Sequence, residues 1–374
     1  MFRPPVSSRR RTSSLHIMPN DFELIVTNMH RNFTGVSATV SAVVRKQATL
    51  SKVQMVGQSL PGCPRPITYR EAVKLTRQRL SDGARVIWHV RRNNEMRAAL
   101  WVRDGLRLPI RIVFTSAAQR RHSPFPRWLI SRMDGIIATT QAAASFLPKV
   151  SATVHHGVDA ELFHPADDPA AEWQKNSWPG GMGVATIGRI RPEKGTDLFV
   201  DAMIELLPDI PDATALIIGK AKREHRAFEA DLRARVATAG LSERIIFVGE
   251  IASEEMPALV RSLSLLVAAP RYEGYGLTPL EAMASGVPIV ATNTGFFSSF
   301  IGDNEAGTLV AQPDPAEIAS ASQTLLQNPL EQALKSSSAR NRAISNFGID
   351  KEVAGIQQVY EALWDEPDKT TALT

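Results

Sequence analysis

Cysteine and long apolar runs are both scarce in this sequence of 374 residues. The single cysteine, Cys63, excludes an internal disulfide and a zinc site built from several thiolates, which agrees with a reducing compartment. Cys63 lies in SLPGCPRP, a setting typical of a turn rather than of a nucleophile. No window reaches the roughly 18–20 apolar residues of a membrane-spanning helix, and the N-terminus lacks the apolar middle segment of a secretory signal. We therefore expect a cytoplasmic protein.

Motifs of several common enzyme and binding classes are absent as well. Neither half of the chain opens with G-x-G-x-x-G, so a nicotinamide dehydrogenase is disfavoured. The chain has no Asp-x-Asp and no Ser/His/Asp or Cys/His arrangement that would indicate a protein nucleophile. No recognised nucleic-acid-binding motif is present, and we expect no nucleic-acid partner.

Charge is distributed unevenly along the chain. Residues 1–180 carry 26 Lys+Arg against 12 Asp+Glu, a formal charge of +14, whereas residues 181–374 carry 17 against 26, a formal charge of −9. Because a surface field attracts opposite charge over about a Debye length, the N-terminal half is suited to an anionic partner. The alternative is that some of these arginines only solvate the surface.

Short β-branched runs alternate with longer polar stretches, first over residues 21–165 and again over residues 183–346. Parallel βαβ units produce this alternation, so we predict an α/β fold of two Rossmann-like, doubly wound domains facing a central cleft. The expected strands lie within 22–29, 83–90, 109–116, 134–140 and 151–157 of the first domain and within 183–189, 213–220, 243–250, 264–270, 287–293 and 306–312 of the second.

Four further segments complete the predicted organisation. Residues 1–20 contain no acidic residue, which predicts a disordered basic leader, either with a targeting role or dispensable before an internal start at Met18. Residues 166–182 are rich in Pro, Gly and acids and predict a linker. Residues 347–366 space apolar side chains at helical intervals, so a helix should pack back toward the N-terminal domain, before a tail at 367–374.

Two cations, Arg189 and Lys194, follow the first strand of the second domain in GRIRPEKGTD. Gly188 and Gly195 should shape this loop, and a helix is expected to begin near Asp197. Two cations beside a helix N-terminus make a binding site for a diphosphate. A solvated charged loop is the alternative for this motif taken alone.

Two glutamates lie eight residues apart in RYEGYGLTPLEAMASG: Glu273 on a loop and Glu281 in the first turn of a helix. Thr278, Pro279 and Glu281 fit the N-cap, first and third helical positions of a capping box. A glycosidase-type acid/base pair needs one carboxyl held protonated, but the nearby cations and helix N-terminus should lower both pKa values. We therefore predict that the two carboxylates accept hydrogen bonds from sugar hydroxyls.

GRIRPEKG, the E-x7-E segment EGYGLTPLEAMASGVPIVAT and EAGTLVAQPDP together resemble the signature of glycosyltransferase family 4. HHGVDAELFHP and the spacing of Phe347, Val353 and Tyr360 extend this resemblance. Members of that family have the two-lobed GT-B fold and transfer a sugar from a nucleotide diphosphate sugar with retention of anomeric configuration. The resemblance thus implies a retaining glycosyltransferase that requires no metal or other cofactor.

The resemblance also implies roles for individual residues. Arg189 and Lys194 would hold the donor diphosphate and Glu273 the hydroxyls of the transferred sugar, and these three would carry catalysis. The leaving phosphate would take the acceptor proton, while Glu281 would bind the ribose and the base would lie near residues 249–251. The donor-binding candidates besides the catalytic three are Gly35, Gly188, Gly249, Glu250, Ile251, Gly274, Tyr275, Gly276, Leu277 and Glu281.

The sequence departs from the family pattern in three places. The first loop has one glycine, Gly35, where a pair is usual, and Phe296 stands where a second glycine is common in the second domain. Ala117 replaces the usual histidine after the central strand of the first domain, so another side chain should act on the acceptor side. The candidates are His89, with a buried strand position as its alternative, and Gln119, Arg120, Arg121 and His122.

Two segments of the basic half, residues 95–111 and 119–132, combine arginine with Met96, Leu100, Trp101, Phe125 and Trp128. Such stretches commonly lie in a membrane interface; the alternative places their aromatics in the core. FTSAAQRRHSPFPRWLI, residues 114–130, in combination with a basic N-terminal domain resembles the mannosyltransferases of lipopolysaccharide core assembly in rhizobia and their relatives. That resemblance implies GDP-mannose as donor, an anionic Kdo-containing lipid A precursor as acceptor, and peripheral contact with the cytoplasmic face of the inner membrane.

Other functions of the same fold stay open. A UDP-sugar-dependent glycosyltransferase or an epimerase is one alternative, and a non-catalytic subunit that binds a nucleotide sugar is another. The presence of Arg189, Lys194, Glu273 and Glu281 together argues against the subunit.

Overall fold

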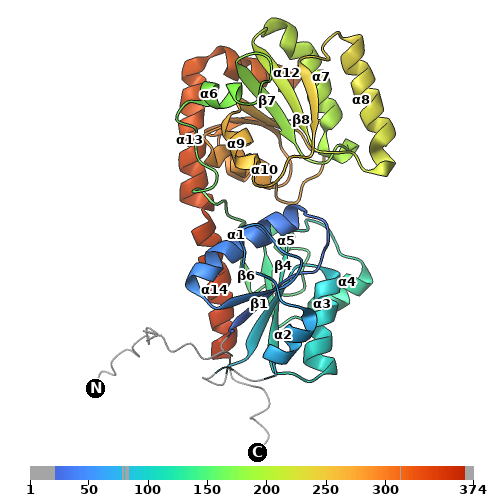
Figure 1. Ribbon diagram of the computed structural model, residues 1–374, viewed down its shortest axis with the longest axis vertical. Coiled ribbons are helices and arrows are strands. Elements are labelled where there is room, and N and C mark those ends of the chain that lie inside the picture. Colours follow the sequence, from blue (N-terminus) through green and yellow to red (C-terminus); the bar gives the residue numbers. More distant parts are fainter. Residues whose placement is uncertain (1–21, 78–79, 81–83, 312, 367–374) are drawn as a thin grey trace, which may run out of the picture.

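The computed structural model describes residues 22–77, 80, 84–311 and 313–366. The expected leader at 1–20 and tail at 367–374 lie outside the described residues. Figure 1 shows two α/β units placed one above the other, with the last two helices running along one side of both. Each unit is built on a six-stranded parallel sheet with a hydrophobic cluster on either face, which confirms the predicted pair of doubly wound domains.

The first sheet has the strand order β2-β1-β3-β4-β5-β6. Its strands are β1 (Leu24–Asn28), β2 (Val53–Gly57), β3 (Val86–Val90), β4 (Ile110–Ser116), β5 (Gly135–Ala138) and β6 (Ala152–Thr153). Five of them fall in the expected segments, whereas β2 was not predicted. This edge strand is five residues long, and Gln54 interrupts its short apolar run, so neither a long run nor clean alternation indicates it.

The second sheet has the order β12-β11-β10-β7-β8-β9, and all six predicted strands are present. They are β7 (Met182–Ile187), β8 (Ala213–Ile218), β9 (Ile245–Gly249), β10 (Leu265–Ala268), β11 (Ile289–Thr292) and β12 (Gly307–Val310). The strand order changes direction at β7, which pairs with β8 on one side and β10 on the other. Ligands of open α/β sheets bind beyond the carboxyl ends of the strands at such a switch point.

Helices cover both faces of the first sheet. They are α1 (Gly35–Leu50), α2 (Tyr69–Leu75), α3 (Asn93–Leu100), a π-helical turn (Trp101–Gly105), α4 (Pro124–Ser131), α5 (Gln141–Ala144) and α14 (Ile349–Asp365). The closing helix α14 packs beside α1, and its Val353, Ile356 and Tyr360 enter the core of the first domain (Figure 1). The end of the chain therefore stabilises the domain in which the chain begins.

The second domain contains α6 (Pro169–Gln174), α7 (Thr196–Leu206), α8 (Arg226–Thr238), α9 (Met256–Arg261), α10 (Leu277–Ala284), α11 (Phe297–Ile301), α12 (Pro315–Gln327) and α13 (Pro329–Phe347). The short helix α6 lies inside the segment 166–182 that composition assigns to a linker. Its Trp173 is fully buried in the second core and donates through Nε1 to the Gly180 carbonyl oxygen at 2.9 Å. This segment is therefore anchored to the second domain.

The chain crosses between the domains after β6 and again between α13 and α14. The two crossings meet where Val158 forms a parallel bridge with Gly348. Beside it the buried carboxylate of Glu352 accepts hydrogen bonds from His156 Nδ1 and the Gly157 amide, both at 2.7 Å. These contacts fix the position of the chain where it crosses between the domains.

Candidate active site

The two cations predicted to hold a diphosphate follow strand β7. Arg189 is exposed, and its guanidinium has no hydrogen bond or ion pair with another described residue. Lys194 Nζ lies 2.5 Å from Glu273 Oε2, although the two residues come from different loops and 79 positions separate them. The structure thus brings two of the three predicted catalytic residues into direct contact.

Close backbone packing forms the floor of this region. An added Cβ on Gly195, which has a φ of 66°, would lie 1.8 Å from the Ala269 carbonyl oxygen. One on Gly219 would lie 1.9 Å from the Gly188 carbonyl oxygen, and the Gly219 amide also donates to Gly249 at 2.7 Å. Only glycine fits at Gly195 and Gly219, so the loops after β7, β8, β9 and β10 meet at one edge of the sheet.

The loop that carries Glu273 leads into α10 by a different route from the predicted capping box. The helix begins at Leu277, with Gly276 as N-cap at a φ of 89°, and no side chain caps it. Thr278 is therefore the second helical residue and Glu281 the fifth, so the capping-box prediction is wrong. Because the Leu277 and Thr278 amides donate to no other residue in the described part of the chain, they are available to an anion in the cleft.

The carboxyl of Glu281 does not have the lowered pKa expected from sequence. The side chain is part-buried near the start of α10, and burial raises its pKa to about 7. Desolvation therefore outweighs the helix N-terminus and the cations in this structure. Near neutral pH, Glu281 can either accept or donate a hydrogen bond.

Two neighbouring groups orient the Glu273 carboxylate. Its Oε1 accepts a hydrogen bond from the Gly274 amide at 2.9 Å, while Oε2 faces Lys194. The carboxylate is oriented from both sides, yet its remaining lone pairs are free for a sugar hydroxyl.

A hollow of about 640 Å³ adjoins the expected base-binding segment. Its lining includes Gly219, Lys220, Arg226, Arg233, Gly249 and Glu250. Arg233 is held over the Phe247 ring, 4.1 Å from its centroid, and so borders the hollow with an oriented charge. Ile251 instead packs against the hydrophobic core of the second domain. Gly249 and Glu250 are thus the members of the predicted base-side segment that face this space.

Two contacts connect the Glu273 loop with the first domain. Gln119 Nε2 donates to the Gly274 carbonyl oxygen at 2.7 Å, and the Tyr275 hydroxyl donates to the His156 carbonyl oxygen at 2.7 Å. Tyr275 is 4% exposed, so its side chain holds the domains together and does not face the donor. Phe296, which stands where a glycine is common, stacks on the Tyr275 ring with 5.2 Å between the ring centroids. The phenylalanine therefore has a packing role that a glycine could not fill.

His89 lies at a buried strand position, which was the alternative to the predicted acceptor-side role. Its side chain is fully buried, Nδ1 lies 2.5 Å from the Tyr360 hydroxyl, and Nε2 lies 2.7 Å from Thr115 Oγ1. Burial, aided by the charge of Arg91, lowers its pKa well below the ordinary value. His89 is therefore a neutral core group rather than an acceptor-side group.

The other acceptor-side candidates lie between β4 and α4. Arg120 and Arg121 are exposed, whereas His122 is part-buried and its Nε2 has no hydrogen-bond partner in the described structure. Burial and the neighbouring Arg120 lower the pKa of His122. Together with Gln119, which reaches the Glu273 loop, these residues belong to the segment that connects the first domain to the donor side.

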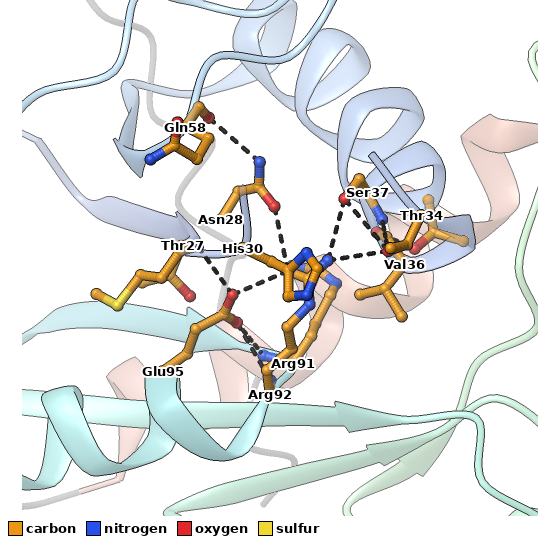
Figure 2. A network of polar contacts seen from close by, with 12 residues as sticks. Thr27, Asn28, His30, Thr34, Val36, Ser37, Gln58, Arg91, Arg92 and Glu95 are labelled. Atoms are coloured by element: carbon orange, nitrogen blue, oxygen red, sulfur yellow. Dashed lines mark hydrogen bonds and ion pairs between the residues drawn. The ribbon is translucent and has the colours of Figure 1, made fainter. Parts of the chain in front are cut away.

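A polar network at the carboxyl ends of β1 and β3 was missed by sequence reasoning (Figure 2). Arg92 donates to Asn28 Oδ1 at 3.1 Å, Glu95 Oε1 at 3.0 Å, Thr34 Oγ1 at 3.2 Å and Ser37 Oγ at 3.0 Å. The network joins β1, the first turn of α1 and the start of α3. The sequence pattern that could have indicated this network is HVRRNNE, in which two arginines directly follow a strand and a glutamate lies three residues after the second arginine.

The segments proposed to touch a membrane divide into buried and exposed parts. Met96 and Leu100 are core residues, so the membrane interpretation is wrong for these two. Trp101, Phe125 and Trp128 are 60%, 53% and 55% exposed, and the Phe125 and Trp128 rings stack at 6.2 Å. None of the helices described is long and apolar enough to cross a bilayer.

No group of three metal-ligating side chains occurs within residues 22–77, 80, 84–311 and 313–366.

Two doubly wound domains, with the predicted donor residues at the switch point of the second, match the GT-B architecture. A solved structure agrees with this fold. The Anabaena protein HepE, crystallised with UDP, superposes with a TM-score of 0.75 over 91% of this chain and 100% of HepE, at 16% identity.

Sequence comparison identifies the family. Residues 172–345 match the family described as glycosyl transferases group 1. The lipopolysaccharide core biosynthesis mannosyltransferase LpsB of Rhizobium meliloti is 41% identical over 92% of this chain and 98% of its own. The mannosyltransferase LpcC of Rhizobium leguminosarum is 39% identical over 92% of this chain and 97% of its own. The chain belongs to the glycosyl transferases group 1 family and is a glycosyltransferase.

Proposed function

We propose that this enzyme transfers mannose from GDP-mannose to a Kdo-containing lipid A precursor during lipopolysaccharide core biosynthesis, with retention of configuration. The observation that carries the proposal is the 41% identity to a lipopolysaccharide core mannosyltransferase over nearly the full length of both chains. The basic N-terminal half supports an anionic acceptor, because the formal charge of +14 on residues 1–180 attracts carboxylates and phosphates.

The proposed reaction breaks the bond between C1 of mannose and the diphosphate oxygen and forms a bond from C1 to an acceptor hydroxyl on the same face. The acceptor proton passes to the leaving phosphate, so no protein nucleophile is involved. Arg189, Lys194 and the free amides at the start of α10 would stabilise the charge that develops on the diphosphate. Glu273 would orient the mannose hydroxyls from its fixed position on the loop.

The choice of GDP is supported by Glu250 at the base-side hollow. Guanine presents two neighbouring donors, N1–H and its exocyclic amine, which one carboxylate can accept together. Uracil presents a single N–H between two carbonyl oxygens, which a carboxylate would repel. Glu250 is an exposed carboxylate in that hollow, and so it favours guanine over uracil.

A metal-free mechanism is part of the proposal. The positive charges available to the diphosphate are those of Arg189 and Lys194, together with the N-terminal ends of α7 and α10. Helix ends and cations of this kind supply the electrostatic stabilisation that a divalent cation gives in other transferases.

Peripheral binding to an anionic membrane is the last part of the proposal. We define the aromatic face as the exposed Trp101, Leu106, Phe125 and Trp128, which lie on the adjoining α3–π-helical and α4 segments. Exposed arginines, including Arg97 and Arg127, occur on the same elements. Aromatic side chains beside basic ones favour the interface of a bilayer that contains anionic lipid.

The proposed donor is tested by a thermal-shift screen of the purified enzyme with GDP, UDP and ADP. A ligand that binds only the folded state raises the unfolding temperature, and at equal concentration the tighter ligand raises it more, so GDP should give the largest shift. Mannosyl transfer from GDP-mannose to Kdo-lipid A then tests the reaction itself. If UDP alone raised the unfolding temperature, GDP-mannose would be excluded as the donor and a UDP-sugar would remain the alternative.

A further inference from the structure

The Arg91 guanidinium, at the carboxyl end of β3, is buried without a partner. Arg91 is 9% exposed, and its Nε and Nη1 are both buried without a hydrogen bond. Arg45 and Arg191 also have a buried Nε without a hydrogen bond, but each lies within ion-pair distance of a carboxylate. The guanidinium of Arg91 forms no hydrogen bond or ion pair with any residue described. Burial accordingly lowers its pKa below the ordinary value.

The carboxylates that act on Arg91 from nearby, Glu95 and Glu352, are already engaged. Glu95 accepts from Arg92 Nη1 and from the amides of Met29, Arg91 and Arg92 at 2.9–3.2 Å. Glu352 accepts from His156 and the Gly157 amide at 2.7 Å. A buried cation costs free energy unless it is paired, so this arrangement leaves an unmet need for an anion.

Free backbone N–H groups lie at the same edge of the first sheet as Arg91. Arg91 follows the central strand β3 at the edge of the sheet where α1 begins, beside the Arg92 network (Figure 2). The first amides of α1, those of Gly35 and Val36, donate to no residue within the described ranges, and an added Cβ on Gly35 would meet open space. A helix of 16 residues thus presents free N–H groups at the same edge.

We propose that Arg91 is an oxyanion-binding residue of the acceptor site and that it receives a carboxylate or phosphate of the acceptor. A planar guanidinium matches both groups through two parallel hydrogen bonds. The donor diphosphate already has Arg189 and Lys194 in the second domain, whereas Arg91 lies in the domain proposed to bind the acceptor. The identity of the ligand rests on the proposed function, since a Kdo-containing acceptor carries carboxylates on Kdo and phosphates on lipid A.

The test compares Arg91→Met with Arg70→Met, which removes an exposed arginine of α2 in the same domain. Free Kdo probes the carboxylate, inorganic phosphate probes the phosphate, and GDP probes the donor site, each by isothermal titration or ligand-observed NMR. Losing hydrogen bonds from a charged group should weaken acceptor-side binding about 10- to 100-fold. Arg91→Met should weaken the binding of Kdo, phosphate or both by this factor, raise the KM for Kdo-lipid A, and leave the GDP affinity unchanged. The control Arg70→Met should match the wild type in all of these measurements.

The unfolding temperature supplies a second readout that a structural role would move in the opposite direction. Replacing an unpaired buried charge with methionine should leave the ligand-free protein equally stable or a few degrees more stable. A fall in unfolding temperature, or unchanged Kdo and phosphate binding, would overturn the proposal. Weakened GDP binding in Arg91→Met would assign the oxyanion to the donor instead and would also overturn it. These binding measurements are independent of turnover, so failure of mannosyl transfer by the wild type would reject the proposed function separately.

Discussion

Lys194 Nζ and Glu273 Oε2 lie 2.5 Å apart at the carboxyl edge of the second sheet. Neither side chain is fully buried, with 26% and 19% exposed, so both can still reach a ligand. A diphosphate and a sugar hydroxyl would each take over part of this contact when the donor binds. The ion pair thus holds the Lys194 ammonium and the Glu273 carboxylate in position before the substrate arrives, which lowers the entropy cost of assembling the site.

Removing either member of this pair should abolish most transfer without unfolding the protein. Lys194→Ala and Glu273→Ala should each lower kcat/KM by about 10²–10³-fold, the range for losing one preorganised electrostatic group. Lys175→Ala breaks a comparable but exposed pair with Glu172 on α6 and should have no effect on rate. Circular dichroism and steady-state kinetics on the purified variants check both statements, and near-wild-type turnover in either site variant would refute the donor-site assignment.

Glu281 should produce a pH dependence that its glutamine variant lacks. Its pKa of about 7 in the folded protein lies above the ordinary value of 4.5, so the native state holds this proton more tightly than the unfolded chain. The stability that Glu281 contributes is therefore fully present below pH 4.5 and is lost as pH rises through 7. Glu281→Gln should gain stability relative to the wild type over this range, as measured by denaturant unfolding at several pH values.

Donor binding should follow the same titration. Ribose hydroxyls donate best to an ionised carboxylate, so GDP affinity of the wild type should rise relative to that of Glu281→Gln between about pH 6 and pH 8. Comparing the two proteins cancels the titration of GDP itself. The exposed Glu205→Gln serves as the control, and parallel pH profiles for all three proteins would show that Glu281 does not bind the donor.

Strand positions and the convergence of the donor loops could be predicted because both depend on local patterns. Apolar runs reveal buried parallel strands, and residues that follow such strands must meet at one edge of the sheet. This reasoning brought Lys194 and Glu273 together across 79 positions. It missed β2, whose five residues carry too little pattern.

Burial and pairing across elements could not be predicted in this way. His89 looks like a polar group at the end of a strand, but Tyr360, 271 positions later, lies against it and encloses it. The raised pKa of Glu281 likewise depends on how closely neighbouring loops cover the carboxyl. Arg91 and Arg92 are adjacent in sequence, yet the Arg92 guanidinium donates four hydrogen bonds and the Arg91 guanidinium donates none to a described residue. This difference is set by long-range packing.

Transfer should continue when divalent cations are removed. If Arg189, Lys194 and the helix ends neutralise the leaving diphosphate, excess EDTA should change the initial rate by less than about twofold. Added Mg²⁺ should likewise leave the rate unchanged in dialysed enzyme. A loss of more than about tenfold in EDTA that Mg²⁺ restores would contradict the metal-free proposal and point to a cation held by the donor phosphates.

The aromatic face should bind anionic vesicles through both apolar burial and charge. Trp101→Ser and Trp128→Ser should each weaken binding to phosphatidylglycerol vesicles by about tenfold, because an indole ring stays in water instead of entering the interface. Arg120→Glu combined with Arg121→Glu should weaken the same binding most at low salt, since screening shortens the range of charge attraction. Leu330→Ser removes an apolar side chain that is 81% exposed on α13 of the other domain, and flotation of this control should match the wild type. Equal flotation of the wild type and all four variants would mean that the aromatic face contacts something other than lipid, and that the arginines of the first domain act on the acceptor alone.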